Sequence, residues 1–282
     1  MIGDSTSTPL WRKAFKGLAA LGITGALFFA IAFGFDASAV RVFLGLTPPL
    51  DVPYVGTRPA TVDTMLDMAE VGPSDHVIDL GTGDGRILLS AAQERGAGGV
   101  GVDLDPVLID QATDAAASAG LTGRVIFLEQ DLFDTPLHEA DVVTMFLLPS
   151  VNLRLRPRLL EELEAGSRIV SNRFDMGDWR PDDVRRVGGY EAYLWIVPAQ
   201  VAGSWRLDVG ESSIPLELEQ SFQDVQGTAA INGQIQLFTP VLRGDRLRFS
   251  LDLPGGEQVF DGLVDGDQFF PADDAEWLAV RE

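Results

Sequence analysis

The 282-residue chain contains no cysteine, which excludes disulfides, a cysteine nucleophile and any metal site built on thiolates. It contains two histidines, His76 and His138, too few for a histidine-rich metal site, so we expect no bound metal. Lysine occurs only as Lys13 and Lys16, and arginine supplies all other positive charge.

Basic residues are outnumbered, and the formal net charge is −21. So acidic a surface repels phosphate backbones, which argues against DNA or RNA as a partner. It would attract a basic protein or a lysine-bearing segment. A solvated acidic surface suited to a salty cytoplasm is the alternative interpretation.

Long uncharged runs are rare, and the longest spans residues 17–35. It approaches the roughly 20 apolar residues that a membrane-spanning helix needs. Ala37-Ser38-Ala39 resembles a signal-peptide cleavage pattern, but the apolar run is longer than a signal core and favours an uncleaved anchor. We therefore expect a protein anchored in a bacterial- or archaeal-type plasma membrane through residues 17–35, with its catalytic domain in the cytosol.

Three parts are predicted along the chain: an anchor and linker at 1–50, an α/β domain at 51–198 and a β-rich domain at 199–282. In the second part apolar strands alternate with helices, which predicts a doubly wound, mainly parallel Rossmann-like sheet. In the third part, short alternating segments separated by turns predict a small antiparallel barrel or sandwich. Those segments are residues 213–218, 229–237, 246–253 and 258–264.

The most informative stretch is Val77 to Arg86, which contains a buried strand, a glycine turn and the start of a helix. Gly81, Gly83 and Gly85 allow a tight bend and a close approach of a ligand to the backbone. A dinucleotide fingerprint would place its third glycine at Arg86, one residue later. With Asp79 before it and Thr82 within it, the turn resembles motif I of the class I S-adenosylmethionine (SAM) methyltransferases.

Acidic residues follow the next two strands of the α/β domain. Asp103 lies about 20 residues beyond the glycine turn, the distance at which such folds place a carboxylate on ribose hydroxyls. Asp131 follows the third strand, where the resemblance to SAM methyltransferases implies an acceptor for the adenine amino group. The expected cofactor-binding residues are Asp79, Gly81, Thr82, Gly83, Gly85, Asp103, Leu104, Asp131 and Leu132.

A more specific resemblance rests on Asp51 to Thr57, Val62 and Asp79 to Ile87. These residues resemble a membrane-associated family of seven-strand protein-lysine methyltransferases, whose animal members act on the mitochondrial ADP/ATP carrier and the ATP synthase c subunit. That family usually has serine where this chain has Thr82. Phe146 to Asn152 and Arg168 to Ser171 also resemble the histone lysine methyltransferases of the disruptor-of-silencing type. The resemblance covers roughly residues 10–185 and leaves out the β-rich part.

The family resemblance implies roles for residues near the acceptor. Tyr54 and Thr57 would border the methyl group, and Phe146, Leu148 and Pro149 would line the acceptor channel. The expected catalytic residues are therefore Tyr54, Thr57, Phe146 and Pro149. The predicted function is methyl transfer from SAM to a lysine of a protein partner. Two alternatives remain: a methyltransferase for a lipid-soluble small molecule, and a SAM-binding scaffold whose β domain binds a partner.

Overall fold

The computed structural model describes residues 56–282, which belong to one compact unit. The expected anchor at 17–35 and the candidate residue Tyr54 lie outside the described residues. The expectation of a membrane-anchored protein is corrected: within residues 56–282 no helix is long and apolar enough to cross a bilayer. The division at residue 198 stays a prediction.

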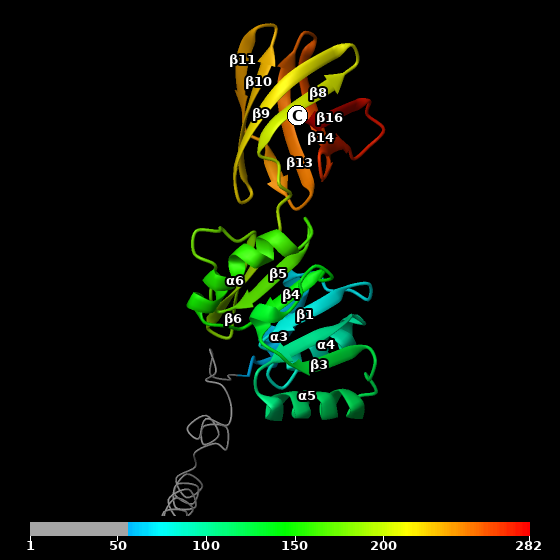
Figure 1. Ribbon diagram of the computed structural model, residues 1–282, viewed down its shortest axis with the longest axis vertical. Coiled ribbons are helices and arrows are strands. Elements are labelled where there is room, and N and C mark those ends of the chain that lie inside the picture. Colours follow the sequence, from blue (N-terminus) through cyan, green and yellow to red (C-terminus); the bar gives the residue numbers. More distant parts are fainter. Residues whose placement is uncertain (1–55) are drawn as a thin grey trace, which may run out of the picture. The chain divides into compact units, whose positions relative to one another are not determined.

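Alternation of strands and helices produces one seven-stranded sheet in the order β3-β2-β1-β4-β5-β7-β6 (Figure 1). The first five strands are parallel, and β7 is antiparallel to β5. The predicted mainly parallel sheet is thus confirmed. Its strands are β1 (His76–Leu80), β2 (Gly98–Asp103), β3 (Val125–Glu129), β4 (Val142–Met145), β5 (Arg168–Asn172), β6 (Asp183–Val187) and β7 (Tyr190–Ile196).

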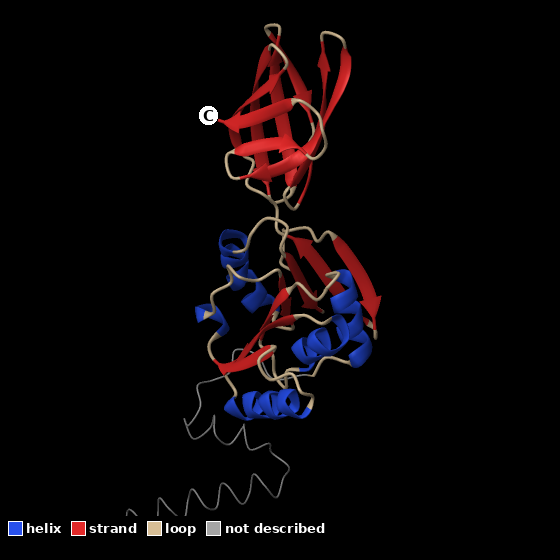
Figure 2. Ribbon diagram, turned by 90° about the vertical axis from the view of Figure 1, so that its right-hand side faces the viewer, coloured by secondary structure: helices blue, strands red, loops and turns tan. Residues whose placement is uncertain are grey.

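Helices cover both faces of this sheet (Figure 2). Apolar residues of α3 (Pro59–Met68), α4 (Arg86–Arg95) and α5 (Pro106–Ser118) share one core cluster with strands of the sheet. On the opposite face, α6 (Pro149–Glu162) and the short 3₁₀ helix η1 (Leu132–Asp134) contribute to a second cluster. Burying apolar side chains on both faces stabilises the sheet.

Local sequence explains the limits of the two helices that flank the candidate site. Helix α4 is flanked by Gly85 and Gly96. Both glycines have the left-handed conformation, which glycine adopts more easily than other residues. Helix α5 starts with Pro106, and the carboxylate of Asp105 accepts a hydrogen bond from Val107 N at 2.9 Å. Helix α4 starts at Arg86, as the sequence predicts.

The C-terminal part is an antiparallel barrel, one of the two predicted forms. Its nine strands follow the order β11-β10-β12-β13-β14-β15-β16-β8-β9, and pairing of β9 with β10 closes the ring. The strands are β8 (Gly203–Val209), β9 (Ser212–Ser221), β10 (Asp224–Ile231), β11 (Gln234–Phe238), β12 (Val241–Arg243), β13 (Arg246–Leu253), β14 (Gly256–Asp265), β15 (Gln268–Pro271) and β16 (Trp277–Arg281).

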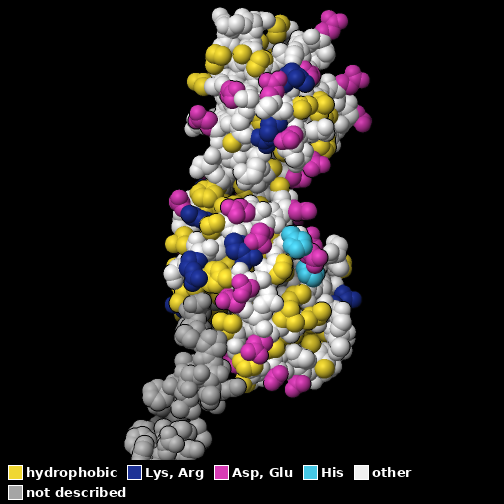
Figure 3. All heavy atoms as spheres, in the orientation of Figure 1, with side chains coloured by type: hydrophobic (Ala, Val, Ile, Leu, Met, Phe, Trp, Pro, Cys, Tyr) yellow, Lys and Arg dark blue, Asp and Glu magenta, His cyan; other side chains and the backbone are white. Residues whose placement is uncertain are grey.

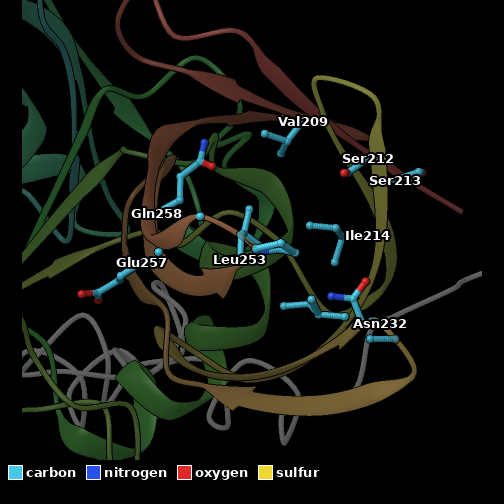
Figure 4. A pocket seen from close by; sticks show the side chains of 13 residues that line it. Val209, Ser212, Ser213, Ile214, Asn232, Leu253, Glu257 and Gln258 are labelled. Carbon is cyan, nitrogen blue, oxygen red and sulfur yellow. The ribbon is translucent and has the colours of Figure 1, made fainter.

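Aromatic side chains fill the barrel interior. Phe249 packs against Phe260 and Phe269, with ring centroids 5.3 and 5.7 Å apart, and Trp277 packs against both of these rings. One mouth of the barrel holds a cavity of about 580 Å³, into which Ile214 and Leu253 project (Figure 4). Because the interior is packed, this cavity is confined to the end of the barrel.

Candidate active site

The glycine turn connects β1 to α4 as predicted. Gly81, Gly83 and Gly85 have φ values of 74°, 56° and 78°, a region that side-chain-bearing residues avoid. The backbone N–H groups of Gly81 and Thr82 both donate to the carbonyl oxygen of Val102 at 2.9 Å. The turn is therefore fastened to the end of β2, beside the predicted ribose carboxylate.

Asp79 lies at the floor of the turn with 1% of its surface exposed. Its two carboxylate oxygens accept hydrogen bonds from the hydroxyls of Thr82 at 2.7 Å and Thr144 at 2.6 Å. Burial raises the pKa of Asp79 to about 6, although both hydroxyl contacts oppose the rise. Thr82 and Thr144 thus hold a carboxyl group whose charge changes close to neutral pH.

Asp103 ends β2 and is partly buried. One carboxylate oxygen accepts from Gly83 N at 2.9 Å and the other from Asp105 N at 3.0 Å. Burial raises the pKa of this carboxyl group. A carboxylate has about four acceptor positions, so each oxygen retains capacity for another donor such as a ribose hydroxyl. Leu104 follows directly and is half-buried.

Asp131 lies just after β3, as the sequence predicts. It is the N-cap of η1, and one of its carboxylate oxygens accepts a hydrogen bond from Phe133 N at 2.9 Å. Leu132 next to it is buried in the core cluster under the sheet. The registers of β1, β2 and β3 align Leu80 with Val102 and Asp103 with Glu129. The turn, Asp103 and Asp131 consequently occupy one edge of the sheet.

Thr57 is tied to the glycine turn by the first residue of α4. The Arg86 guanidinium donates a hydrogen bond to the Thr57 carbonyl oxygen at 2.9 Å and forms an ion pair with Asp84 at 2.5 Å. The Arg86 group also lies against Gly56, where an added Cβ would come within 2.6 Å of it. The structure therefore brings the segment before motif I to the turn that motif I forms.

Residues after β4 form the other side of this edge. Leu147 packs on the turn, since a Cβ at Gly81 would lie 2.8 Å from its Cδ2 atom. Phe146 is half-buried, and its ring lies 6.5 Å from the ring of Phe174, which follows β5. Leu148 is half-buried, whereas Pro149 is exposed in the first turn of α6.

Phe174 was not predicted, and its position depends on Asn152. The buried Asn152 amide donates to the carbonyl oxygens of Phe174 and Asp175, both at 3.2 Å. Ser171 Oγ donates to the same Phe174 oxygen at 2.7 Å. Thr144 was also missed, although a single hydroxyl residue within the apolar run Val142 to Met145 is a usable signal for a buried polar contact.

Several known proteins are similar to the central part of this chain. Residues 79–183 match the family described as the ANTKMT methyltransferase domain. A protein-lysine N-methyltransferase of Saccharolobus islandicus (strain REY15A) is 39% identical over 151 residues, which cover 52% of this chain and 94% of that protein. The chain belongs to this protein-lysine methyltransferase family.

Two further relatives are similar to this methyltransferase. The lysine N-methyltransferase of the ATP synthase c subunit from Xenopus laevis is 32% identical over 186 residues, covering 65% of this chain and 77% of the relative. A crystal structure described as that of an RNA methyltransferase from Salinibacter ruber, in complex with S-adenosyl-L-homocysteine, is 46% identical. It covers 52% of this chain and 96% of the other, with a TM-score of 0.51.

The residues of this methyltransferase fit SAM as its cofactor. The three left-handed glycines leave the backbone of the turn open to a ligand, and a carboxylate stands at the end of β2. The same edge carries the carboxylate of Asp131 and the aromatic side chain of Phe146. Such a mixture of backbone, carboxylate and apolar surface matches a molecule with an amino acid, a ribose and an adenine.

Proposed function

We propose that this methyltransferase transfers the methyl group of SAM to the ε-amino group of a lysine in a protein partner. Membership of a family that contains protein-lysine N-methyltransferases carries this proposal. The strong net negative charge of −21 supports it, because such a surface favours the approach of a lysine-bearing segment. The names of the relatives suggest protein substrates as different as a component of ATP synthase and an adenine nucleotide translocase.

In the reaction, SAM supplies a methyl group activated by its sulfonium. With SAM bound, the lysine nitrogen would attack this methyl group after its ammonium proton had passed to water, and the sulfur would keep the electrons of the broken S–C bond. The protein mainly orients the two reactants and excludes water. An apolar approach to the methyl group would favour the neutral amine that this displacement requires.

Each predicted residue has a proposed role in this scheme. Asp79 and the glycines Gly81, Gly83 and Gly85 surround the methionine part of SAM, with Thr82 supporting Asp79. Asp103 and Leu104 bind the ribose side, and Asp131 and Leu132 the adenine side. Tyr54 and Thr57 border the methyl group, and Phe146 and Pro149 line the acceptor channel. The support is that β1, β2, β3 and β4 run parallel, so the segments that follow them, which carry most of these residues, leave the sheet at the same side.

Two other acceptors need a direct test. The Salinibacter ruber protein is described as an RNA methyltransferase, and a lipid-soluble small molecule is an alternative from the sequence. Net charge argues against RNA for this chain, since phosphate backbones would be repelled. The purified full-length protein would be incubated with tritiated SAM and a cell extract, and then separated into protein, RNA and organic fractions.

Label on lysine in the protein fraction, located by mass spectrometry, is the expected result. Label confined to the organic fraction or to RNA would contradict the lysine assignment. SAM binding without transfer to any fraction would favour the scaffold alternative. The Asp103→Asn variant serves as a control, because it should lose labelling in parallel with SAM affinity.

A further inference from the structure

A small pocket lies beside the proposed acceptor side and carries positive charge. Its cavity of about 360 Å³ is bounded by the residues after β5 and by the β6–β7 hairpin. The lining residues are Arg173, Phe174, Arg186, Gly189, Tyr190 and Glu191. Two arginines, two aromatic rings and one carboxylate therefore meet around a single opening.

The positive charge of this pocket contrasts with the acidic composition of the chain. Acidic side chains are scattered over the face shown in Figure 3, and the whole chain has a net charge of −21. Other arginines form ion pairs with carboxylates. Arg185 pairs with Asp183 at 2.9 Å, and Arg168 pairs with Asp75 at 2.7 Å. Within residues 56–282, neither Arg173 nor Arg186 has a carboxylate partner within 4.0 Å.

The one carboxylate of the pocket, Glu191, lies opposite Arg186 in the β6–β7 register but forms no ion pair within 4.0 Å with either arginine. Glu191 accepts a hydrogen bond from the Tyr193 hydroxyl at 2.6 Å. The Arg173 guanidinium instead stacks over Tyr190, 4.3 Å from the ring centroid, and lies 5.4 Å from the centroid of Phe174. Stacking on aromatic faces holds a guanidinium in place and leaves its N–H groups available to a planar anion.

The backbone of Arg173 is strained. Its φ of 76° lies in the left-handed region, which residues other than glycine rarely adopt. Its N–H donates to Glu191 O at 2.7 Å, which fixes the residue to β7. Strain of this kind collects at functional sites, where surrounding contacts hold a side chain in a required direction.

Contacts link the pocket to both segments of the proposed acceptor side. Phe174 lines the pocket and also packs against Phe146 after β4. Gly188 lies at the tip of the hairpin, and its carbonyl oxygen accepts a hydrogen bond from Arg58 Nη1 at 3.4 Å. Arg58 directly follows the buried Thr57. The pocket is thus connected to Phe146 through the ring of Phe174. It also borders the segment that contains Thr57.

We infer that Arg173 and Arg186 bind the carboxylate of an aspartate or glutamate that lies near the target lysine in the protein substrate. This inference rests on the proposed function, because it assumes a lysine acceptor. The acceptor side then binds two side chains of opposite charge. The lysine enters beside the glycine turn, and the two arginines bind its acidic neighbour. Carboxylates pair with guanidinium groups through two parallel hydrogen bonds, which fixes orientation as well as affinity.

The experiment uses the full-length protein, tritiated SAM and a cell extract, followed by mapping of methylated lysines. Peptides around one mapped lysine are then compared with the neighbouring acid present or replaced by its amide. We expect wild-type kcat/KM to fall about tenfold on replacement of the acid, which is the effect of one charged hydrogen-bonded pair. The double variant Arg173→Asn and Arg186→Gln should treat both peptides alike, with unchanged SAM affinity.

Asparagine suits position 173 because it tolerates the left-handed conformation, so the fold should survive. Arg248→Gln in β13 is the matched control, since this exposed arginine lies on the barrel and should leave the acid preference intact. Equal rates on acid and amide peptides with the wild-type protein would overturn the inference while leaving lysine methylation standing. Absence of any methylated lysine in the extract, or transfer of label to RNA, would remove the proposed function and the inference together.

Discussion

Arg86 reaches from the first turn of α4 to the carbonyl oxygen of Thr57, 29 residues earlier in the chain, with a hydrogen bond of 2.9 Å. The same guanidinium is ion-paired with Asp84 inside the glycine turn. The Arg86 side chain therefore links the cofactor turn to the segment proposed to border the methyl group. Loss of this link would change the distance and orientation between SAM and the acceptor lysine.

Replacing Arg86 by alanine should lower kcat by about tenfold or more, because a displacement of about 1 Å in a positioning element can cost up to about 100-fold. SAM affinity should change much less than kcat. Methyl transfer and calorimetric SAM titration measure the two effects separately. Arg95→Ala provides the control, since Arg95 lies at the other end of α4 and pairs with the exposed Asp67 at 2.7 Å. Equal losses in both variants would show that the link acts through helix stability alone.

Gly81→Ala should abolish measurable SAM binding. The new Cβ would lie 2.8 Å from Leu147 Cδ2, and φ at this position is 74°. Gly120 has nearly the same φ of 71° but no atom within 4 Å of an added Cβ. Gly120→Ala should therefore lose a similar backbone energy of about 1–2 kcal/mol and still bind SAM normally. Thermal unfolding and SAM titration of the two variants separate conformational strain from loss of the site.

Asp103→Asn should weaken SAM binding by roughly 1–3 kcal/mol, through ribose hydroxyls that lose a charged acceptor. The asparagine Oδ1 can still accept the hydrogen bond from Gly83 N, which holds the turn, whereas its amide group loses the bond from Asp105 N. Asp110→Asn on the exposed surface of α5 removes the same charge from the same region and should leave affinity unchanged. If both variants bind SAM as the wild type does, the ribose assignment is wrong.

Stability should depend on pH through Asp79. Its pKa rises from 3.8 to about 6 on folding, so between these values the unfolded chain ionises while the folded protein keeps its proton. The contribution of Asp79 to the free energy of unfolding is therefore greatest below pH 3.8 and is lost as pH rises to about 6. About two pKa units correspond to about 3 kcal/mol.

Asp79→Asn removes this titration and should become more stable relative to the wild type as pH rises. Urea unfolding at about pH 5 and about pH 8, both above the sequence pI of about 4.3, should capture about half of the roughly 3 kcal/mol difference. A difference between variant and wild type that stays constant over this range would show that Asp79 titrates as an ordinary carboxyl group. Thr144→Val should raise the pKa of Asp79 further, because one stabilising hydroxyl is lost.

The cofactor side of the site could be predicted because its signals are local. The strand, glycine turn and helix from Val77 to Arg95 follow one another in the sequence, and the structure reproduces them. The predicted family and the predicted cofactor, SAM, are also confirmed, because both predictions rest on this local motif. The membrane localisation is corrected, because no helix within residues 56–282 is long and apolar enough to cross a bilayer.

The acceptor side could not be predicted as fully, because its contacts join distant segments. Strand β6 was missed since Asp183 to Val187 contains two arginines and lies at the edge of the sheet, where polar residues are tolerated. Phe174 owes its place to Asn152, 22 residues earlier. In the barrel, one predicted strand at 229–237 is a hairpin of β10 and β11, and Asn232-Gly233 between them is a turn signal that was overlooked.

Closure of the barrel has a consequence for biosynthesis. Its first strand pairs with its last, with Trp205 of β8 opposite Arg281 of β16. The seven-stranded sheet, by contrast, is complete once β7 ends at Ile196. Domains fold as units from the N-terminal end during synthesis. The seven-stranded sheet can therefore form its pairings before β8 to β16 are translated, whereas closure of the barrel requires β16, and loss of β16 would leave β8 with an unpaired edge.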